Sequence, residues 1–260
     1  MDDVKPLKVC ILSSGSKGNS TFIQSDTTNL LIDIGRSCAY ISSKLEELNV
    51  NPNNIDAILI THTHNDHISG LKVFVKKYHP RVYLTQKMYE DLKDILPFED
   101  CILIEEPFHI QDLSIDYIKT SHDTSDSNGY IIRKQDHSIV YITDTGYIHQ
   151  KNDQKLKNHS LYIMESNHDI KMLMNGKYPY HIKQRIQGDR GHLSNEDASK
   201  NLSKYIGDKT KCVVLAHLSH DNNTEEKAYT TLTNQLLHNN QEIEQIIIAK
   251  QEERTELIEV

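Results

Sequence analysis

The sequence lacks several features that would place it in a familiar class. It has no tryptophan and four phenylalanines, and its cysteines, Cys10, Cys38, Cys101 and Cys212, form no Cys-x-x-Cys pair. Neither a zinc ribbon nor a disulfide scaffold is indicated, and we expect reduced, packed thiols. No stretch approaches the roughly 18 apolar residues of a spanning helix, and the first residues do not place a basic region before an apolar one. We therefore expect a cytoplasmic protein without a membrane association.

An excess of positive charge is also absent. The formal net charge of −8 at pH 7 offers no general attraction to nucleic acid, although it ignores bound metal ions and local patches. The 260 residues can bury a substantial core, and no internal repeat or low-complexity linker divides them. We predict one domain over residues 1–260. The informative feature of the composition is its 15 histidines.

Apolar runs and helical patterns alternate along the chain. The runs predict strands at residues 7–12, 29–34, 55–60, 101–104, 114–118, 130–132, 138–142, 161–164 and 212–215. Helical spacing predicts helices at residues 38–48, 71–78, 147–156, 196–205 and 225–237. Residues 194–197 and 223–226 each combine a cap with an acidic first turn. The alternation predicts an α/β protein with mixed sheets covered by helices.

The segment 61–67, THTHNDH, gathers four groups that can bind metal within six residues. Side chains two residues apart on an extended segment project to one side, and Asp66 and His67 follow where the chain turns toward a helix. Imidazole and carboxylate suit zinc, manganese or iron, and four such groups exceed what one catalytic zinc needs. We predict a hydrolase with two adjacent divalent ions at this loop.

A two-ion centre needs more ligands than one loop supplies. Three polar residues, His122, Asp144 and His217, each follow a predicted strand and would meet the loop at one sheet edge. Any one of them alone is equally explained as a solvated loop residue. Their repeated placement favours a shared site.

These residues, together with the segment 31–35 (LIDIG), resemble the metallo-beta-lactamase superfamily. The resemblance implies a four-layer αββα sandwich with two mixed sheets. It also implies one ion held by His62, His64 and His122, another held by Asp66, His67 and His217, and Asp144 bridging both. Asp33 would stand behind the ligands and orient the histidine loop. Asp144, where antibiotic-degrading members commonly have cysteine, argues against lactamase activity.

Segments 13–20, 165–169, 191–195 and 216–223 are similar to a narrower group, the bacterial YycJ/WalJ-type proteins. That similarity implies a metal-dependent exonuclease acting on DNA. Two ions would lower the pKa of a shared water and generate a hydroxide nucleophile, with Asp66 in the catalytic machinery. His192, in a loop that opens a helix, would donate a proton to the leaving group or hold the phosphate. The alternative for His192 is a capping-region residue without a catalytic part.

Further candidates surround this centre. Glu165 would orient ligands, and the residues expected to contact substrate are Ser14, Lys17, Asn19, Asn167, His168, Lys183, Arg185, Ser194 and Ser219. Lysines and arginines with interleaved tyrosines between residues 171 and 190 would grip the DNA backbone and stack bases. The competing interpretations are a hairpin turn at residues 14–19, structural hydrogen bonds at residues 165–168 and a solvated face at residues 171–190.

Two other functions use the same ligands. One is a small-molecule hydrolase of cyclic phosphodiesters or thioesters, which needs no groove for a strand. The other is a metal-binding regulatory module without catalysis, although closed structural zinc sites prefer four ligands, often cysteines. No protein partner is implied by the sequence.

Overall fold

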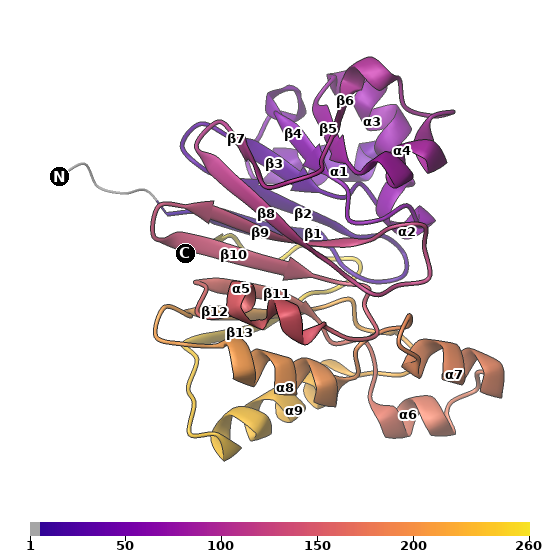
Figure 1. The fold of residues 1–260 in the computed structure, drawn as a ribbon, viewed down its shortest axis with the longest axis vertical. Helices are drawn as coiled ribbons and strands as arrows, with labels where there is room; N and C mark the ends of the chain where they lie inside the picture. Colours follow the sequence, from indigo (N-terminus) through magenta and orange to yellow (C-terminus); the bar gives the residue numbers. More distant parts are fainter. Residues whose placement is uncertain (1–5) are drawn as a thin grey trace.

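Two seven-stranded sheets lie face to face, and helices cover both outer faces (Figure 1). This computed structural model describes residues 6–260, so the start of the chain, on which the expectation about a leader depended, lies outside the described residues. The predicted four-layer αββα arrangement with two mixed sheets is confirmed. Within residues 6–260, none of the helices combines the length and apolar character that crossing a membrane requires.

The first sheet has the strand order β14-β1-β2-β3-β4-β5-β6. Strands β14 to β3 are antiparallel neighbours, and β3 to β6 are parallel. The strands are β1 (Lys8–Ser13), β2 (Ser20–Gln24), β3 (Asn29–Ile32), β4 (Ala57–Leu59), β5 (Arg81–Leu84), β6 (Cys101–Leu103) and β14 (Ile258–Glu259).

The second sheet repeats this plan in the order β13-β12-β11-β10-β9-β8-β7. Strands β7 to β10 are antiparallel and β10 to β13 are parallel. The strands are β7 (Phe108–Ile110), β8 (Leu113–Lys119), β9 (Asn128–Lys134), β10 (His137–Ile142), β11 (Leu161–Glu165), β12 (Cys212–Ala216) and β13 (Gln245–Ile248). Parallel strands end at one edge of their sheet, so the loops after β10, β11 and β12 emerge together.

Strands buried on both faces explain why the sequence shows continuous apolar runs. In β1, Val9 and Ile11 face the opposite sheet, whereas Cys10 and Leu12 pack under the helices. The first sheet is covered by α1 (Cys38–Glu47), α3 (Leu71–Tyr78) and α4 (Gln86–Leu92), and the second by α5 (Asp153–Leu156), α8 (Asn195–Tyr205) and α9 (Glu225–His238). Three short helices complete the described set: α2 (Asn65–Ile68), α6 (Ile170–Asn175) and α7 (Tyr180–Gln187).

The two predicted helix starts are confirmed by their caps. Ser194 Oγ accepts a hydrogen bond from the Asp197 amide at 3.0 Å, and Thr224 Oγ1 accepts one from the Lys227 amide at 3.1 Å. Each cap satisfies an amide that has no partner within its own helix.

The helix predicted at residues 147–156 begins three residues later than expected, because residues 150–156 are helical and residues 147–149 are not. The chain forms a 3-10 turn at Gln150–Asn152 and then the four-residue α5. The reason is that the His149 side chain accepts a hydrogen bond from the Lys151 amide at 3.1 Å and starts a new turn after the loop that leaves β10. Several short or polar elements were also missed, namely β2, β5, β7, β13, β14, α2, α4, α6 and α7.

Tyr130 links the interior of the sandwich to the start of the histidine loop. It is fully buried, and its hydroxyl donates to the Ile60 carbonyl at 2.6 Å. We expect Tyr130→Phe to lower the free energy of unfolding by about 1–3 kcal/mol, because the buried carbonyl loses its donor. Urea unfolding measures this, with the surface change Tyr147→Phe as a control expected within about 0.5 kcal/mol of wild type. Equal effects of both changes would contradict the interpretation.

Candidate metal centre

The seven residues predicted as metal ligands converge at one edge of the sandwich. They follow β4 (His62, His64, Asp66 and His67), β8 (His122), β10 (Asp144) and β12 (His217). Ligand atoms lie within 4.8 Å of one another in the set His62, His64 and His122 and in the set Asp66, His67 and His217. Asp144 joins a set with His62 and His67 and another with Glu165, His192 and His217. The described residues thus form two adjacent clusters with one shared carboxylate.

Three residues of the site have left-handed backbone angles where the chain leaves a strand. Asp33, Asp144 and His217 have φ values of 60°, 55° and 56°. Such angles are uncommon outside glycine, although Asp and His tolerate them best, and they persist where neighbours hold the chain. The Asp33 carboxylate accepts hydrogen bonds from the Thr61 amide (2.8 Å) and hydroxyl (2.7 Å), and the His217 amide donates to Ser14 Oγ (2.8 Å).

Gly35 allows the Asp66 loop to lie against the turn between β1 and β2. The Asn19 amide donates to the Asp66 carbonyl at 2.7 Å, and the Gly35 amide donates to the Asn19 carbonyl at 2.8 Å. A Cβ atom at Gly35 would lie 1.8 Å from the Asp66 carbonyl oxygen. Only glycine therefore permits this close approach, which sets the position of the Asp66 backbone beside the turn.

Oxygen atoms behind the histidines orient their rings. His67 Nδ1 lies 2.7 Å from Asp33 Oδ2, and His217 Nδ1 lies 3.1 Å from Glu165 Oε1. His62 Nδ1 lies 3.1 Å from Thr61 Oγ1, and His122 Nδ1 lies 3.1 Å from the Gly191 carbonyl. Partners of this kind select the tautomer and leave the other ring nitrogen for a metal.

Buried polar atoms in the centre fit divalent cations. His62 Nε2, Asp144 Oδ2 and His217 Nε2 are buried without a hydrogen-bond partner among the described residues. Burial, reinforced by His67, holds the pKa of His62 well below its usual value, so its lone pair is available. Burial alone would lower the pKa of His67, but Asp144 and Asp33 raise it to about 10. The carboxylates thus stabilise positive charge where the clusters meet. A divalent ion bound by imidazole and carboxylate ligands would provide that charge.

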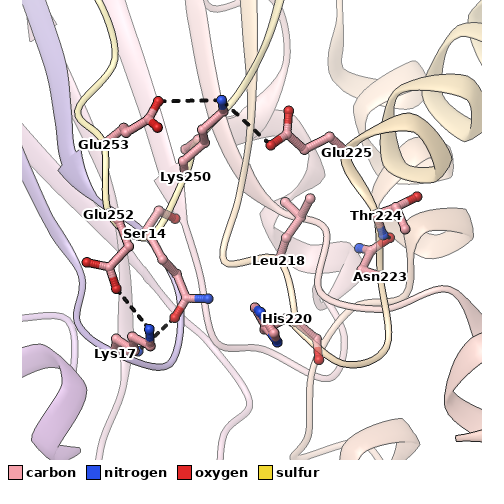
Figure 2. A pocket seen from close by; sticks show the side chains of 13 residues that line it. Ser14, Lys17, Leu218, His220, Asn223, Thr224, Glu225, Lys250, Glu252 and Glu253 are labelled. Atoms are coloured by element: carbon pink, nitrogen blue, oxygen red, sulfur yellow. Dashed lines mark hydrogen bonds and ion pairs between the residues drawn. The ribbon is translucent and has the colours of Figure 1, made fainter.

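A cavity of about 250 Å³ opens over the clusters. Its lining includes His64, Asp66, His122, Asp144, His192 and His217, together with the expected substrate contacts Asn167, Arg185 and Ser219. A neighbouring groove of about 510 Å³ contains two more of the nine expected contacts, Ser14 and Lys17 (Figure 2). The loop at residues 218–220 separates the two spaces and lines both.

Four expected substrate contacts lie outside the cavity instead. His168 and Ser194 are buried, and Ser194 is the cap of α8. Asn19 is buried too, with its side-chain amide 3.0 Å from His67 Nε2. The Lys183 ammonium donates to the carbonyls of Met174 (2.7 Å) and Gly176 (2.8 Å) at the end of α6. The structure brings none of these four into the cavity.

The sequence interpretation missed several residues of the site. His220 and Asp221 line the cavity, and Asp123 lies against His64 and His122. Tyr178 and Ser16 line the cavity too, and the sequence had included them only within its candidate segments. The available signal for Asp123 was its position directly after the expected ligand His122. His220 and Asp221 lie within the segment 216–223, which stood out for its resemblance alone.

The fold and the cluster define a class, and comparison with known proteins agrees with it. Residues 28–217 match the model of the beta-lactamase superfamily domain, and the chain belongs to this superfamily. Among solved structures, the metallo-beta-lactamase fold protein YhfI from Bacillus subtilis has a TM-score of 0.76 at 20% identity, with 98% of this chain and 100% of that chain covered.

Two relatives are more similar in sequence. Exodeoxyribonuclease WalJ of Streptococcus pneumoniae serotype 2 (strain D39 / NCTC 7466) is 37% identical over 236 residues, which cover 88% of each chain. Exodeoxyribonuclease YycJ of Bacillus anthracis is 35% identical over 227 residues, which cover 85% of this chain and 86% of that one. The predicted resemblance to this group is confirmed. Family and cluster together support a metal-dependent hydrolase.

Divalent ions should stabilise the folded chain, because they complete clusters that exist only in the native state. Metal at about 100 times its dissociation constant adds about 2.7 kcal/mol. For a chain of this size the melting temperature should rise by roughly 5–10 °C. Scanning calorimetry with Mn²⁺ or Zn²⁺ measures the shift, which EDTA should reverse. Asp144→Asn should reduce it, and the exposed control Asp136→Asn should retain it. An unchanged wild-type melting temperature with Mn²⁺, Zn²⁺ and Fe²⁺ would refute this expectation.

Proposed function

We propose that this protein is a two-ion exonuclease that hydrolyses phosphodiester bonds at the ends of DNA. The observation that carries the proposal is the pair of ligand clusters joined by Asp144, in a chain similar over most of its length to two proteins named exodeoxyribonuclease. We propose further that residues 1–260 act as one catalytic domain and that the protein works in the cytoplasm.

The ligand assignment follows the two clusters. His62, His64 and His122 hold one ion, and Asp66, His67 and His217 hold the other, with Asp144 between them. Zinc or manganese suits this donor set, and iron is a third candidate. Two such cations would supply Lewis-acid chemistry at the phosphate and would lower the pKa of a bound water. Asp33 and Glu165 keep the histidine rings aimed at these positions.

His192 is the proton donor in this proposal. Its Nδ1 lies 2.7 Å from Glu165 Oε1, which leaves Nε2 as the ring nitrogen for substrate. Burial alone would lower the pKa of His192, but the charge of Glu165 raises it above the usual value. A higher pKa favours the protonated ring, and a protonated ring can give its proton to the departing oxygen.

DNA reaches the cavity beside an arm formed by residues 170–190, which carries α6 and α7 and projects from the lower part of the molecule (Figure 1). Lys171 and Lys177 are exposed and make no hydrogen bond or ion pair within residues 6–260, and Tyr180 is 66% exposed. These side chains supply charge for a phosphate backbone and a ring for base stacking. Asn167, Arg185 and Ser219 would contact the terminal nucleotide inside the cavity.

End-labelled DNA tests the reaction itself. With Mn²⁺ or Zn²⁺ we expect nucleotide release from linear duplex or single-stranded DNA, no cleavage of covalently closed circles, and no activity in Asp66→Ala. A cyclic phosphodiester and a thioester are assayed in parallel. Turnover of either small molecule, with no nucleotide released from DNA under any of several metals, would replace this proposal by a small-molecule hydrolase.

The role of His192 has its own signature. His192→Ala should lower kcat by about 10²- to 10⁴-fold, the usual contribution of a positioned proton donor. Metal content should remain at the wild-type value, because neither of the two proposed ligand sets contains His192. Since His192 also lies in a set with Asp144, Glu165 and His217, metal content separates a proton donor from a ligand. His238→Ala, which removes an exposed histidine at the end of α9, is the control and should change kcat little. A loss of metal in His192→Ala would contradict the assignment.

The arm predicts how DNA affinity depends on salt. Replacing Lys171 and Lys177 with Gln should weaken binding and reduce the slope of log K against log [salt] by up to about 0.9 for each duplex phosphate that is no longer neutralised. Lys72→Gln with Lys76→Gln on α3, in the opposite helical layer, changes the net charge equally and is the control. Identical effects of the two double changes would exclude the arm as a DNA-binding surface.

A further inference from the structure

Asp123 stands behind His64 in the way that other oxygen atoms stand behind the remaining histidines of the clusters. His64 Nδ1 lies 3.2 Å from His122 Nε2, so this nitrogen faces the cluster. The opposite nitrogen, His64 Nε2, lies 3.8 Å from Asp123 Oδ1. Asp123 is therefore the acid that faces the outward nitrogen of His64.

The two carboxylate oxygens of Asp123 have different surroundings. Oδ2 accepts a hydrogen bond from Arg185 Nε at 2.6 Å, and the Arg185 Nη2 group also contacts it. Oδ1 is buried and has no hydrogen-bond partner among the described residues. One oxygen is thus held by α7, and the other is free to accept a hydrogen bond from an imidazole.

The geometry assigns Asp123 to an indirect role. Its Oδ1 lies 3.5 Å from His122 Nε2, but the set of converging ligand atoms contains His62, His64 and His122 without it. The 3.8 Å separation from His64 exceeds a hydrogen bond, so the two groups interact through their facing charges and dipoles in this structure. A carboxylate behind a metal-binding histidine fixes the ring and increases its basicity.

We propose that Asp123 is a positioning residue for His64, and that Arg185 couples this residue to the arm. Arg185 holds the carboxylate, the carboxylate orients the His64 ring, and the ring presents Nδ1 to one of the two ions. Docking of the arm thereby sets the affinity of that ion. The inference rests on the two-ion centre of the proposed function and adds a residue outside its ligand set.

Metal titration without substrate tests the inference. Asp123→Asn keeps the size of the side chain, but with its oxygen bonded to Arg185 it presents an NH₂ group to the His64 N–H and cannot accept a hydrogen bond. Mn²⁺ or Zn²⁺ alone is titrated against a chromophoric chelator. We expect Asp123→Asn to bind two ions, one of them about 10- to 100-fold more weakly than in wild type.

Asp126→Asn is the matched control, because Asp126 lies three residues further along the same loop. Its Oδ2 accepts hydrogen bonds from Lys119 (2.6 Å) and Thr85 (2.7 Å) and faces no ligand histidine. Both dissociation constants should stay at the wild-type values in this variant. Arg185→Met leaves Asp123 in place and should weaken the same ion by a smaller factor, which keeps the test valid if Asp123→Asn folds poorly.

The outcomes separate this inference from the proposed function. A wild-type protein that binds no divalent ion would overturn the two-ion proposal itself. Two wild-type ions with equal constants in Asp123→Asn and Asp126→Asn would overturn only the role of Asp123. Loss of one ion from Asp123→Asn at saturating metal would make Asp123 a ligand and also overturn the positioning role. Unchanged constants in Arg185→Met would remove the coupling to the arm.

Discussion

The buried carboxylate of Asp33 is the contact on which the candidate centre depends. It leaves the end of β3 with left-handed backbone, accepts both donors of Thr61, and lies 2.7 Å from His67 Nδ1. A charged group with no exposed surface persists only when its neighbours satisfy it. The Asp33 carboxylate therefore holds both the start of the histidine loop, at Thr61, and its end, at His67. The ligands between these two residues are positioned by the same contact.

Glu165 performs the corresponding task in the second sheet. It is fully buried at the end of β11, accepts hydrogen bonds from the amides of Thr145 (3.0 Å) and Leu193 (3.2 Å), and contacts the rings of His192 and His217. Burial alone would raise the pKa of Glu165, but His192 lowers it to about 2. Each sheet thus contributes one buried anion that organises the loops of its own edge, and Asp144 lies where the two sets meet.

The candidate ligands and the outer wall of the cavity are held in different ways. The ligands and the acids behind them are held by strand ends, whereas the arm at residues 170–190 is connected to the centre through individual hydrogen bonds. Arg185 reaches Asp123, and Arg190 donates to the carbonyls of His122 (3.2 Å) and Thr124 (3.4 Å). These bonds connect the arm to the loop that carries His122 and Asp123.

The sequence alone determined the α/β class, the runs buried on both faces, two helix caps and the seven ligand candidates. These depend on local spacing, because a polar residue directly after a buried strand must emerge at a sheet edge. Tertiary structure decided which side chains meet across different loops. The contact of Asp123 with His64 and the burial of His168 depend on sheet order and register, which local spacing does not specify. The bonds from Lys183 to the end of α6 depend on how α7 folds back on α6. The late start of the helix predicted at residues 147–156 has a local cause, the cap that the His149 side chain supplies.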